Sequence, residues 1–184
     1  EYQAGSFSFR YFDHRFPAAP RSYALILGHR LEDLEKKIGS DSPAWLEWQS
    51  ILTAIRHLPD RLETDPSRIA EGLREKEIIK RRLATLTEKE APVRDHLDSL
   101  VAELNGVAGD PRSFDRLDQL LEEQAYRLSF WRVASDEINY RRFFDVNELA
   151  AISNERDEVF QATHALVLQW LADGSIDGLR IDHV

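Results

Sequence analysis

Two residues near the end of the chain have the types and the spacing for nucleophilic chemistry. Arg180 and Asp182 lie two positions apart in the run GLRIDHV, residues 178–184. Side chains two positions apart on a β-strand point to the same face of the sheet. A guanidinium on that face favours the ionised carboxylate, which is the form that a carboxylate nucleophile needs. The pattern fits an aspartate that is salt-bridged at a strand end equally well, and spacing alone leaves both interpretations open.

His183 directly follows this aspartate. Strict alternation places it on the opposite face, but where a chain turns at a strand end a histidine can reach a bound hydroxyl. A structural role is the alternative for a single histidine. Together with His14 and His164 it does not form a metal-ligand spacing, so we expect no metal site.

A second candidate group occupies residues 140–145, with the sequence YRRFFD. Aromatic faces stack on the C–H surfaces of sugars, and guanidinium groups donate to hydroxyls or orient carboxylates. The pattern therefore suits a site for a polyhydroxy ligand. The alternative is a packed aromatic cluster whose arginines pair with Asp145 and Glu148.

The composition excludes several classes of function. The 184 residues are 42% hydrophobic and 31% charged, and the net charge is −9. This acidic balance argues against a nucleic-acid groove, which needs clustered basic residues. The absence of cysteine excludes disulfides, thiol catalysis and cysteine zinc sites. No phosphate-cradling glycine loop is present, and we expect no cofactor.

No apolar run reaches the roughly 18 residues that span a bilayer, and no targeting segment is visible. We therefore expect a cytoplasmic protein with no membrane partner. The chain has no methionine and begins at Glu1, whereas ordinary usage would supply about four methionines. We expect an internal piece of a larger protein, and a mature chain that has lost its leader is the alternative.

The elements that must position these residues fall into three parts. Residues 1–21 are aromatic and locally alternating, with a strand expected over residues 7–12. Residues 22–128 have the stripes and stops of about five helices. Residues 129–184 change character again and carry both candidate groups.

Start signals and apolar stripes mark the helices of residues 22–128. Ser22 and Ser113 are expected to cap helices, and Pro43, Pro66 and Pro92 to occupy first helical turns. The helices are expected over residues 22–38, 43–55, 66–86, 92–104 and 113–121. The charge run at residues 80–82 is expected to be a solvated helix face.

Residues 129–184 are expected to contain a short strand at 130–133, a helix capped by Asn154 and ended by Gly174, and a strand at 176–181. A helix, a short turn and a buried strand form half of a β/α barrel unit. Barrels of this kind place their active sites at the C-terminal ends of the strands, where Asp182 would lie.

Three segments together resemble one family. Residues 177–183, DGLRIDH, resemble the strand motif that bears the catalytic nucleophile in the α-amylase superfamily. Residues 138–150, INYRRFFDVNELA, look like a segment typical of maltooligosyltrehalose synthases, and residues 7–17, FSFRYFDHRFP, are similar to another stretch of that family. The first motif fits many amylases, whereas the other two are long and narrow in distribution.

The resemblance implies an isomerase, an intramolecular glucosylmutase of trehalose biosynthesis. Such enzymes convert the reducing-end α-1,4 linkage of a maltooligosaccharide into an α,α-1,1 linkage, with retention. By that match Asp182 would be the nucleophile, Arg180 would align it, and His183 would contact hydroxyls of the reacting sugar. The reducing-end side of the cleft would be lined or braced by Tyr140, Arg141 and Arg142.

The resemblance also implies the architecture. We expect a mainly α protein with few short strands, in which a helical insertion subdomain, residues 22–128, is flanked by pieces of a TIM-type barrel, residues 1–21 and 129–184. The acid/base glutamate and the early barrel strands would lie outside this chain, so the isolated piece should be inactive. The oligomeric state is open. A hydrolytic amylase-type or debranching glycosidase and a helical protein-interaction module are the alternatives.

Overall fold

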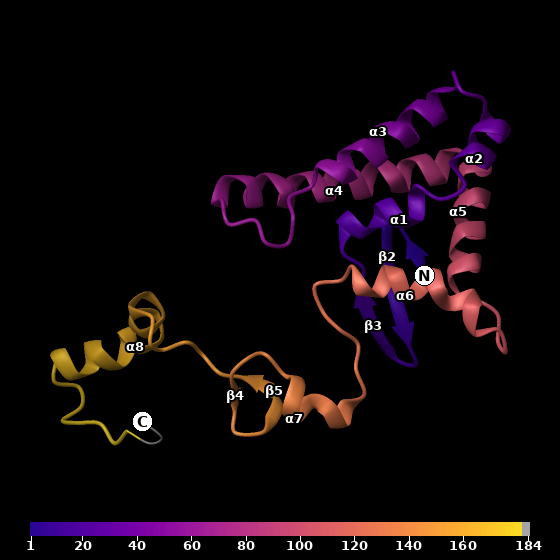
Figure 1. Ribbon diagram of the computed structural model, residues 1–184. Helices are drawn as coiled ribbons and strands as arrows, with labels where there is room; N and C mark the ends of the chain where they lie inside the picture. Colours follow the sequence, from indigo (N-terminus) through magenta and orange to yellow (C-terminus); the bar gives the residue numbers. More distant parts are fainter. Residues whose placement is uncertain (182–184) are drawn as a thin grey trace. The chain divides into compact units, whose positions relative to one another are not determined.

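The computed structural model describes residues 1–181, apart from the side chains of Ala134 and Ser135. The chain divides into two units, Glu1–Leu128 (unit 1) and the part from Ser129 onward (unit 2) (Figure 1). Both contain helices and a few short strands, which confirms the mainly α prediction. The barrel and the three-part division into domains stay predictions.

Unit 1 opens with a small antiparallel sheet of β1 (Tyr2–Gln3), β2 (Ser6–Tyr11) and β3 (His14–Pro17). The strand expected from the alternating aromatics is β2, and its two neighbours were not predicted. Gly5, in the β1–β2 turn, has a positive φ of 81°. A Cβ there would lie 1.9 Å from the Lys80 carbonyl oxygen, so the turn can pack against α4 only with glycine at this position.

The helices of unit 1 follow in the expected order (Figure 1). Pro43 begins α3 and Pro66 begins α4 as predicted, behind the caps Ser42 and Asp65, whose side chains accept from Trp45 N and Ser67 N at 3.1 and 2.8 Å. The bounds are α1 (Tyr23–Leu27), α2 (Leu31–Ile38), α3 (Pro43–His57), α4 (Pro66–Lys89), α5 (Ala91–Leu104) and α6 (Asp115–Glu122), with 3-10 turns η1 (Pro20–Ser22) and η2 (Pro111–Phe114).

The single helix expected over residues 22–38 is wrong, because the structure divides it into α1 and α2. Arg30 interrupts the helix with a left-handed φ of 52°. The interruption leaves the Leu27 carbonyl free of the helix ladder, and it accepts a hydrogen bond from the Trp48 indole at 3.2 Å. Leu27 and Leu34 are both fully buried on either side of the break.

The two serine caps were also predicted wrongly. Ser22 lies in η1 and its hydroxyl donates to the Ala19 carbonyl at 2.7 Å, so it does not cap α1. Ser113 lies in η2, where its hydroxyl accepts from Val107 N at 2.7 Å. Serine satisfies turn backbones as readily as helix ends, and the sequence signal is the same for both.

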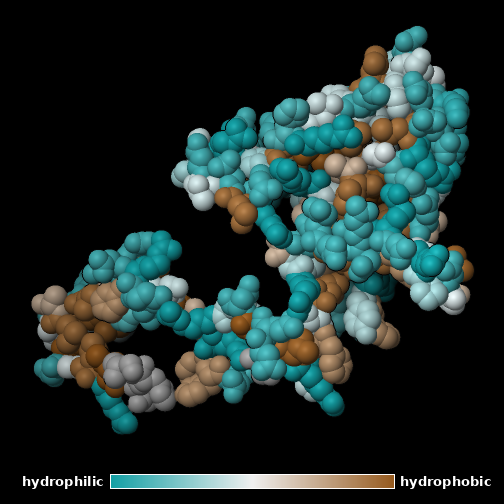
Figure 2. Space-filling model, viewed as in Figure 1, coloured by the Kyte–Doolittle hydropathy of each residue, from teal (hydrophilic) through white to brown (hydrophobic). Residues whose placement is uncertain are grey.

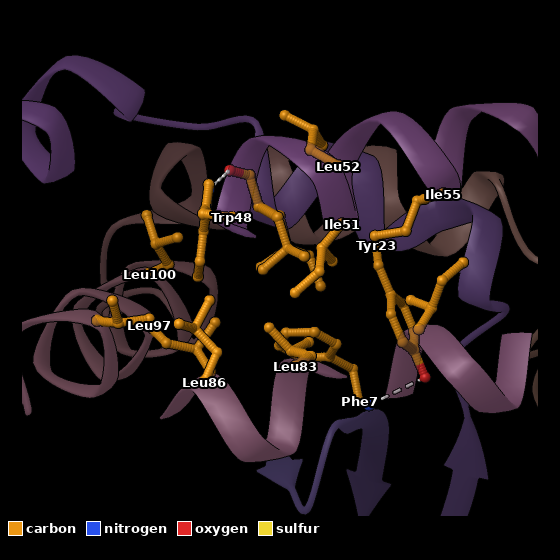
Figure 3. Packing of buried hydrophobic residues seen from close by; sticks show 14 of the residues in the cluster. Phe7, Tyr23, Trp48, Ile51, Leu52, Ile55, Leu83, Leu86, Leu97 and Leu100 are labelled. Atoms are coloured by element: carbon orange, nitrogen blue, oxygen red, sulfur yellow. Dashed lines mark hydrogen bonds between the residues drawn. The ribbon is translucent and has the colours of Figure 1, made fainter. Parts of the chain in front are cut away.

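A single hydrophobic core joins the sheet of unit 1 to its helices. Figure 3 shows its packing: Phe7 from β2 lies beside Tyr23, whose hydroxyl accepts from Phe7 N at 3.2 Å. Trp48 and Ile51 of α3 and Leu83 of α4 are buried in the same cluster. Burying one such side chain contributes about 1.5–3 kcal/mol to folding. The core therefore fixes residues 1–21 to the helices.

A buried amide ties the end of unit 1 back to its beginning. Gln124 accepts from Ala19 N at 2.7 Å and donates to Ser22 Oγ and the Leu120 carbonyl at 3.1 and 2.6 Å. Nothing in the sequence pattern predicted this residue, because two of its partners, Ala19 and Ser22, lie about a hundred positions away.

Unit 2 contains η3 (Trp131–Val133), α7 (Ala134–Glu137), the hairpin β4 (Arg142–Phe143) and β5 (Val146–Ala150), and α8 (Asp157–Ala172). The strand expected at 130–133 is wrong, since η3 occupies it. Asn154 does not cap α8, which begins at Asp157 behind Arg156. The helix ends as expected before Gly174, whose φ is 73°.

The strand expected at residues 176–181 is also wrong, because this segment is irregular as far as Ile181. A strand needs a neighbouring backbone to pair its N–H and C=O groups, and no described strand pairs with this segment. Figure 2 shows hydrophobic residues on the surface over α8, and the exposed side chains include Phe160, Leu166 and Trp170. Among the described helices, none combines the length and the apolar character needed to cross a membrane.

Candidate functional site

The β4–β5 hairpin carries three of the residues that the sequence singled out. The strands are antiparallel, and Phe143 pairs with Val146 around the two-residue loop Phe144–Asp145. Between Arg142 and Phe143 the register jumps from Ala150 to Val146, so the extra residues of this irregularity lie on β5. The aromatic and basic residues of this segment therefore lie in a short, irregular hairpin.

Arg142 braces this hairpin. Its guanidinium donates to the Asn147 side-chain oxygen and, at 3.4 Å, to the Asp145 carboxylate. Its side chain is only 14% exposed. The pairing with Asp145 is the one that the alternative interpretation anticipated, and it positions the turn.

Tyr140 and Arg141 are each held by one hydrogen bond to a residue that follows the hairpin turn in the sequence. The Tyr140 hydroxyl donates to the Asn147 carbonyl at 2.6 Å. Arg141 donates to the Glu155 carboxylate at 2.8 Å, and this hydrogen bond is the main cause of the lowered pKa of Glu155. Both partners of the Arg141–Glu155 pair are solvent-exposed, so the pair orients the guanidinium but adds little stability.

Sequence reasoning missed Asn147 and Glu155, which hold these three side chains in place. Asn147 receives one hydrogen bond from Tyr140 and one from Arg142, through its backbone and side-chain oxygens respectively. The sequence did offer one signal for Asn147. Asparagine is depleted in β-strands, so its presence in the run VNELA, two residues after Asp145, indicates a specific role for its side chain.

Arg180 lies in the irregular segment after α8 and is exposed. Within the part of the chain that the structure describes, no hydrogen bond or ion pair joins Arg180 to the hairpin. Asp182 and His183 lie outside the described residues, so the expected shared face of Arg180 and Asp182 stays a prediction. No group of three or more metal-binding side chains occurs among the described residues.

The hairpin offers guanidinium donors, a phenol and aromatic faces within six consecutive residues. Such a set binds polyhydroxy ligands by stacking on apolar ring faces and donating to hydroxyls. The same run also contains the Asp145 carboxylate, which accepts a hydrogen bond from Arg142 at 3.4 Å.

Comparison with known proteins gives one partial likeness. No family model matches the chain, and no solved structure matches it. A curated protein named "Putative maltooligosyl trehalose synthase", from two strains of Mycobacterium tuberculosis, is 43% identical over 63 residues. The matched stretch covers 34% of this chain and 8% of that protein's length. The chain is thus similar over a third of its length to a protein of that name.

Proposed function

We propose that this chain is the nucleophile-bearing part of a maltooligosyltrehalose synthase, a glucosylmutase of the α-amylase superfamily. The identity of 43% over 63 residues to the mycobacterial protein carries this proposal. Residues 177–183 also support it, since they resemble the strand motif that bears the catalytic nucleophile in that superfamily. The barrel that would hold this motif is part of the proposal.

The proposed reaction moves one glycosidic bond within the substrate. The Asp182 carboxylate attacks the anomeric carbon of the penultimate glucose, and the bond to the O4 oxygen of the reducing-end glucose breaks. That oxygen takes a proton from an acid supplied outside this chain, which leaves a covalent glycosyl ester on Asp182. The anomeric hydroxyl of the released glucose then attacks the anomeric carbon of this glycosyl ester. The bond from that carbon to the Asp182 carboxylate breaks, and the hydroxyl proton returns to the same acid/base group. The product is an α,α-1,1 linkage, and no water is consumed.

The side chains of the hairpin would act on the leaving glucose. In a mutase this glucose has to turn over and attack before water does, so it has to be retained and oriented. Arg141, fixed by Glu155, and Tyr140, fixed by Asn147, present donors and a ring that suit this task. Arg142 would position the turn without contacting the sugar.

The substitution Asp182→Asn in the full-length polypeptide that contains this chain tests the proposal. Loss of the nucleophile should lower trehalosyl formation from maltopentaose by about a thousandfold or more. Binding of maltopentaose should survive, because the amide keeps the size of the carboxylate. The measurement is chromatographic separation of the products together with the loss of reducing ends.

Asp157→Asn is the matched control, because it makes the same change at an exposed position in the first turn of α8 and should leave turnover unchanged. Glucose and maltose as the main products of the parent would show a hydrolase and refute the mutase. An Asp182→Asn variant with full activity would refute the assignment of the nucleophile.

A further inference from the structure

Unit 1 contains a small cavity whose charged lining is entirely basic. It lies between α1, α3, α5 and α6 and has a volume of about 240 Å³. Sites for drug-sized ligands usually measure about 300–1,000 Å³, so this cavity suits an ion or a molecule of a few heavy atoms. Arg56 and Arg116 line it, and among the described residues no carboxylate does. We name it the cationic cavity.

Arg56 is the arginine of the cationic cavity that has no partner. Within the part of the chain that the structure describes, its guanidinium makes no hydrogen bond and no ion pair. It reaches the end of α1, since its Nη2 lies 3.9 Å from the position that a Cβ at Gly28 would take. The N–H groups of Arg56 are therefore available to a ligand in the cavity.

Arg116 is held in place by a network of polar groups. Its Nη1 donates to His29 Nδ1 at 2.8 Å, and its Nη2 donates to the Leu25 carbonyl at 3.4 Å. Because Nδ1 accepts, the imidazole proton is on Nε2, which donates to the Glu103 carboxylate at 2.8 Å. Glu103 also lies 3.6 Å from Arg116 Nε and 3.6 Å from Arg30 Nη1, so three basic side chains share its charge. Each η nitrogen of Arg116 keeps a second N–H for a ligand.

Backbone acceptors that border the cavity are already used. The Ala24 carbonyl accepts from Gly28 N at 3.0 Å, and the Ile26 carbonyl accepts from His29 N at 3.2 Å. The side-chain amide of Gln119 adds a further donor to the lining. Donors are therefore in surplus at the cationic cavity, and an anion supplies the acceptors that they lack.

The two arginines also indicate which anion fits. Two guanidinium groups that line one small cavity repel each other, and an anion between them replaces this repulsion with two attractions. Arginine binds the oxygens of phosphate and carboxylate groups through its forked N–H donors. Because Arg56 and Arg116 come from separate helices, the ligand has to offer oxygens in more than one direction. A tetrahedral phosphate group does so, whereas the two oxygens of a carboxylate lie in one plane.

We propose that the cationic cavity binds a phosphate group, either inorganic phosphate or the phosphate of a small monoester, between Arg56 and Arg116. His29 and Glu103 act as positioning residues, because they hold Arg116 and have no free donor to offer the anion. The site lies entirely within unit 1. It does not depend on the reaction proposed above.

Titration of this 184-residue chain, followed by NMR of its backbone amides, tests the proposal. Inorganic phosphate and glycerol 3-phosphate are added separately to a chloride buffer at constant ionic strength. Either compound should shift the amide signals of Gly28, His29 and Arg116 in a saturable way. The compound with the lower dissociation constant identifies the source of the phosphate group.

Substitutions of Arg56 separate a ligand contact from a structural role. Arg56→Gln should weaken phosphate binding about tenfold, because a hydrogen bond to a charged group is lost. Its melting temperature should match that of the parent, since Arg56 has no partner to lose among the described residues. Arg56→Lys keeps the charge without the fork, so its affinity should lie between those of the parent and Arg56→Gln.

Arg94→Gln is the matched control, because it removes the same charge at an exposed position of α5 outside the cavity. It should leave the affinity for phosphate unchanged. The proposal fails if neither phosphate compound gives saturable shifts, if the shifts arise only outside the cavity, or if Arg56→Gln binds as tightly as the parent. Sodium acetate that binds as tightly as phosphate would assign the cavity to carboxylates and would also overturn the proposal.

Discussion

His96 is fully buried in unit 1, and among the described residues neither of its ring nitrogens has a hydrogen-bond partner. It packs edge-on against Trp48, with ring centroids 5.9 Å apart. Burial lowers the pKa of His96, and the positive charges of Lys37 and Arg30 lower it further against the opposing effect of Asp33. The histidine is therefore neutral in the folded state, and its imidazole acts as an apolar filler with two unsatisfied polar atoms.

Acid should destabilise unit 1 through this residue. The unfolded chain takes up a proton near the ordinary histidine pKa of about 6.5, whereas the folded state does so only at lower pH. The free energy of unfolding should therefore fall as the pH decreases below about 6.5. His96→Leu should remove this pH dependence. At a pH near 5, the free energy of unfolding of the variant should exceed that of the parent by about 1 kcal/mol. Urea unfolding at a series of pH values measures it.

His57→Gln serves as the control, since His57 is exposed in the last turn of α3. Its stability profile should keep the same slope as that of the parent. Parallel profiles for His96→Leu and the parent would contradict the prediction.

At the scale of the elements, α3 and α4 are joined by an ion pair on their polar sides. Arg82 donates to both oxygens of Glu47, at 2.7 and 2.9 Å, and to Ser50 Oγ at 2.8 Å. The hydrogen bonds from Arg82 lower the pKa of Glu47. The expectation of a solvated face at residues 80–82 holds for Arg81, which is exposed, whereas Lys80 and Arg82 are half-buried and Arg82 is paired with Glu47. Helical periodicity shows that a residue is on the polar side, and it does not show that another helix presents a carboxylate there.

Arg82→Gln should lower the free energy of unfolding by about 0.5–1 kcal/mol, because a bidentate pair is stronger than a simple one and partial exposure weakens it. The stabilising effect of the pair is present above the ordinary glutamate pKa of about 4.3 and is lost as the pH falls through the lowered value. Chemical denaturation of the two proteins at neutral pH measures the difference. Arg81→Gln, one residue earlier on α4, is the control and should change the free energy of unfolding by less than about 0.5 kcal/mol. An equal loss of stability in the Arg81→Gln and Arg82→Gln variants would refute the ion pair as the cause.

At the scale of the whole molecule, the two units differ in how they are stabilised. Unit 1 has one core built from the sheet, α1–α6 and the turn at Ala18. In unit 2, no described side chain of residues 129–181 is buried, and α8 has no buried residue. Hydrophobic burial is the main favourable term in folding. Because the described residues of unit 2 are not buried, hydrophobic burial contributes little to the stability of this unit.

Hydrogen exchange of this 184-residue chain should reflect that difference. Amides of α3, α4 and α5 should open only by global unfolding of unit 1, whereas amides of α8 should exchange orders of magnitude faster through local opening. Mass spectrometry of peptic fragments measures both sets in one experiment. Equal protection of α8 and α4 would show that unit 2 is stabilised by contacts beyond those described here.

The sequence by itself determined the features whose causes are local. Proline starts and apolar stripes correctly placed α3, α4 and α5, because each helix satisfies its own backbone within a few residues. The same local pattern identified the YRRFFD segment as a basic aromatic cluster, and the structure fixes it with Asn147 and Glu155.

Tertiary structure decided the features whose partners are distant. The division of α1 from α2 depends on Trp48, and the pairing of Arg82 depends on Glu47. The expected strands at 130–133 and 176–181 did not form, since a strand exists only where another backbone lies beside it. Local sequence patterns specify the helices and the types of turn. The contacts between these elements depend on residues that are distant in the sequence, and only the tertiary structure shows them.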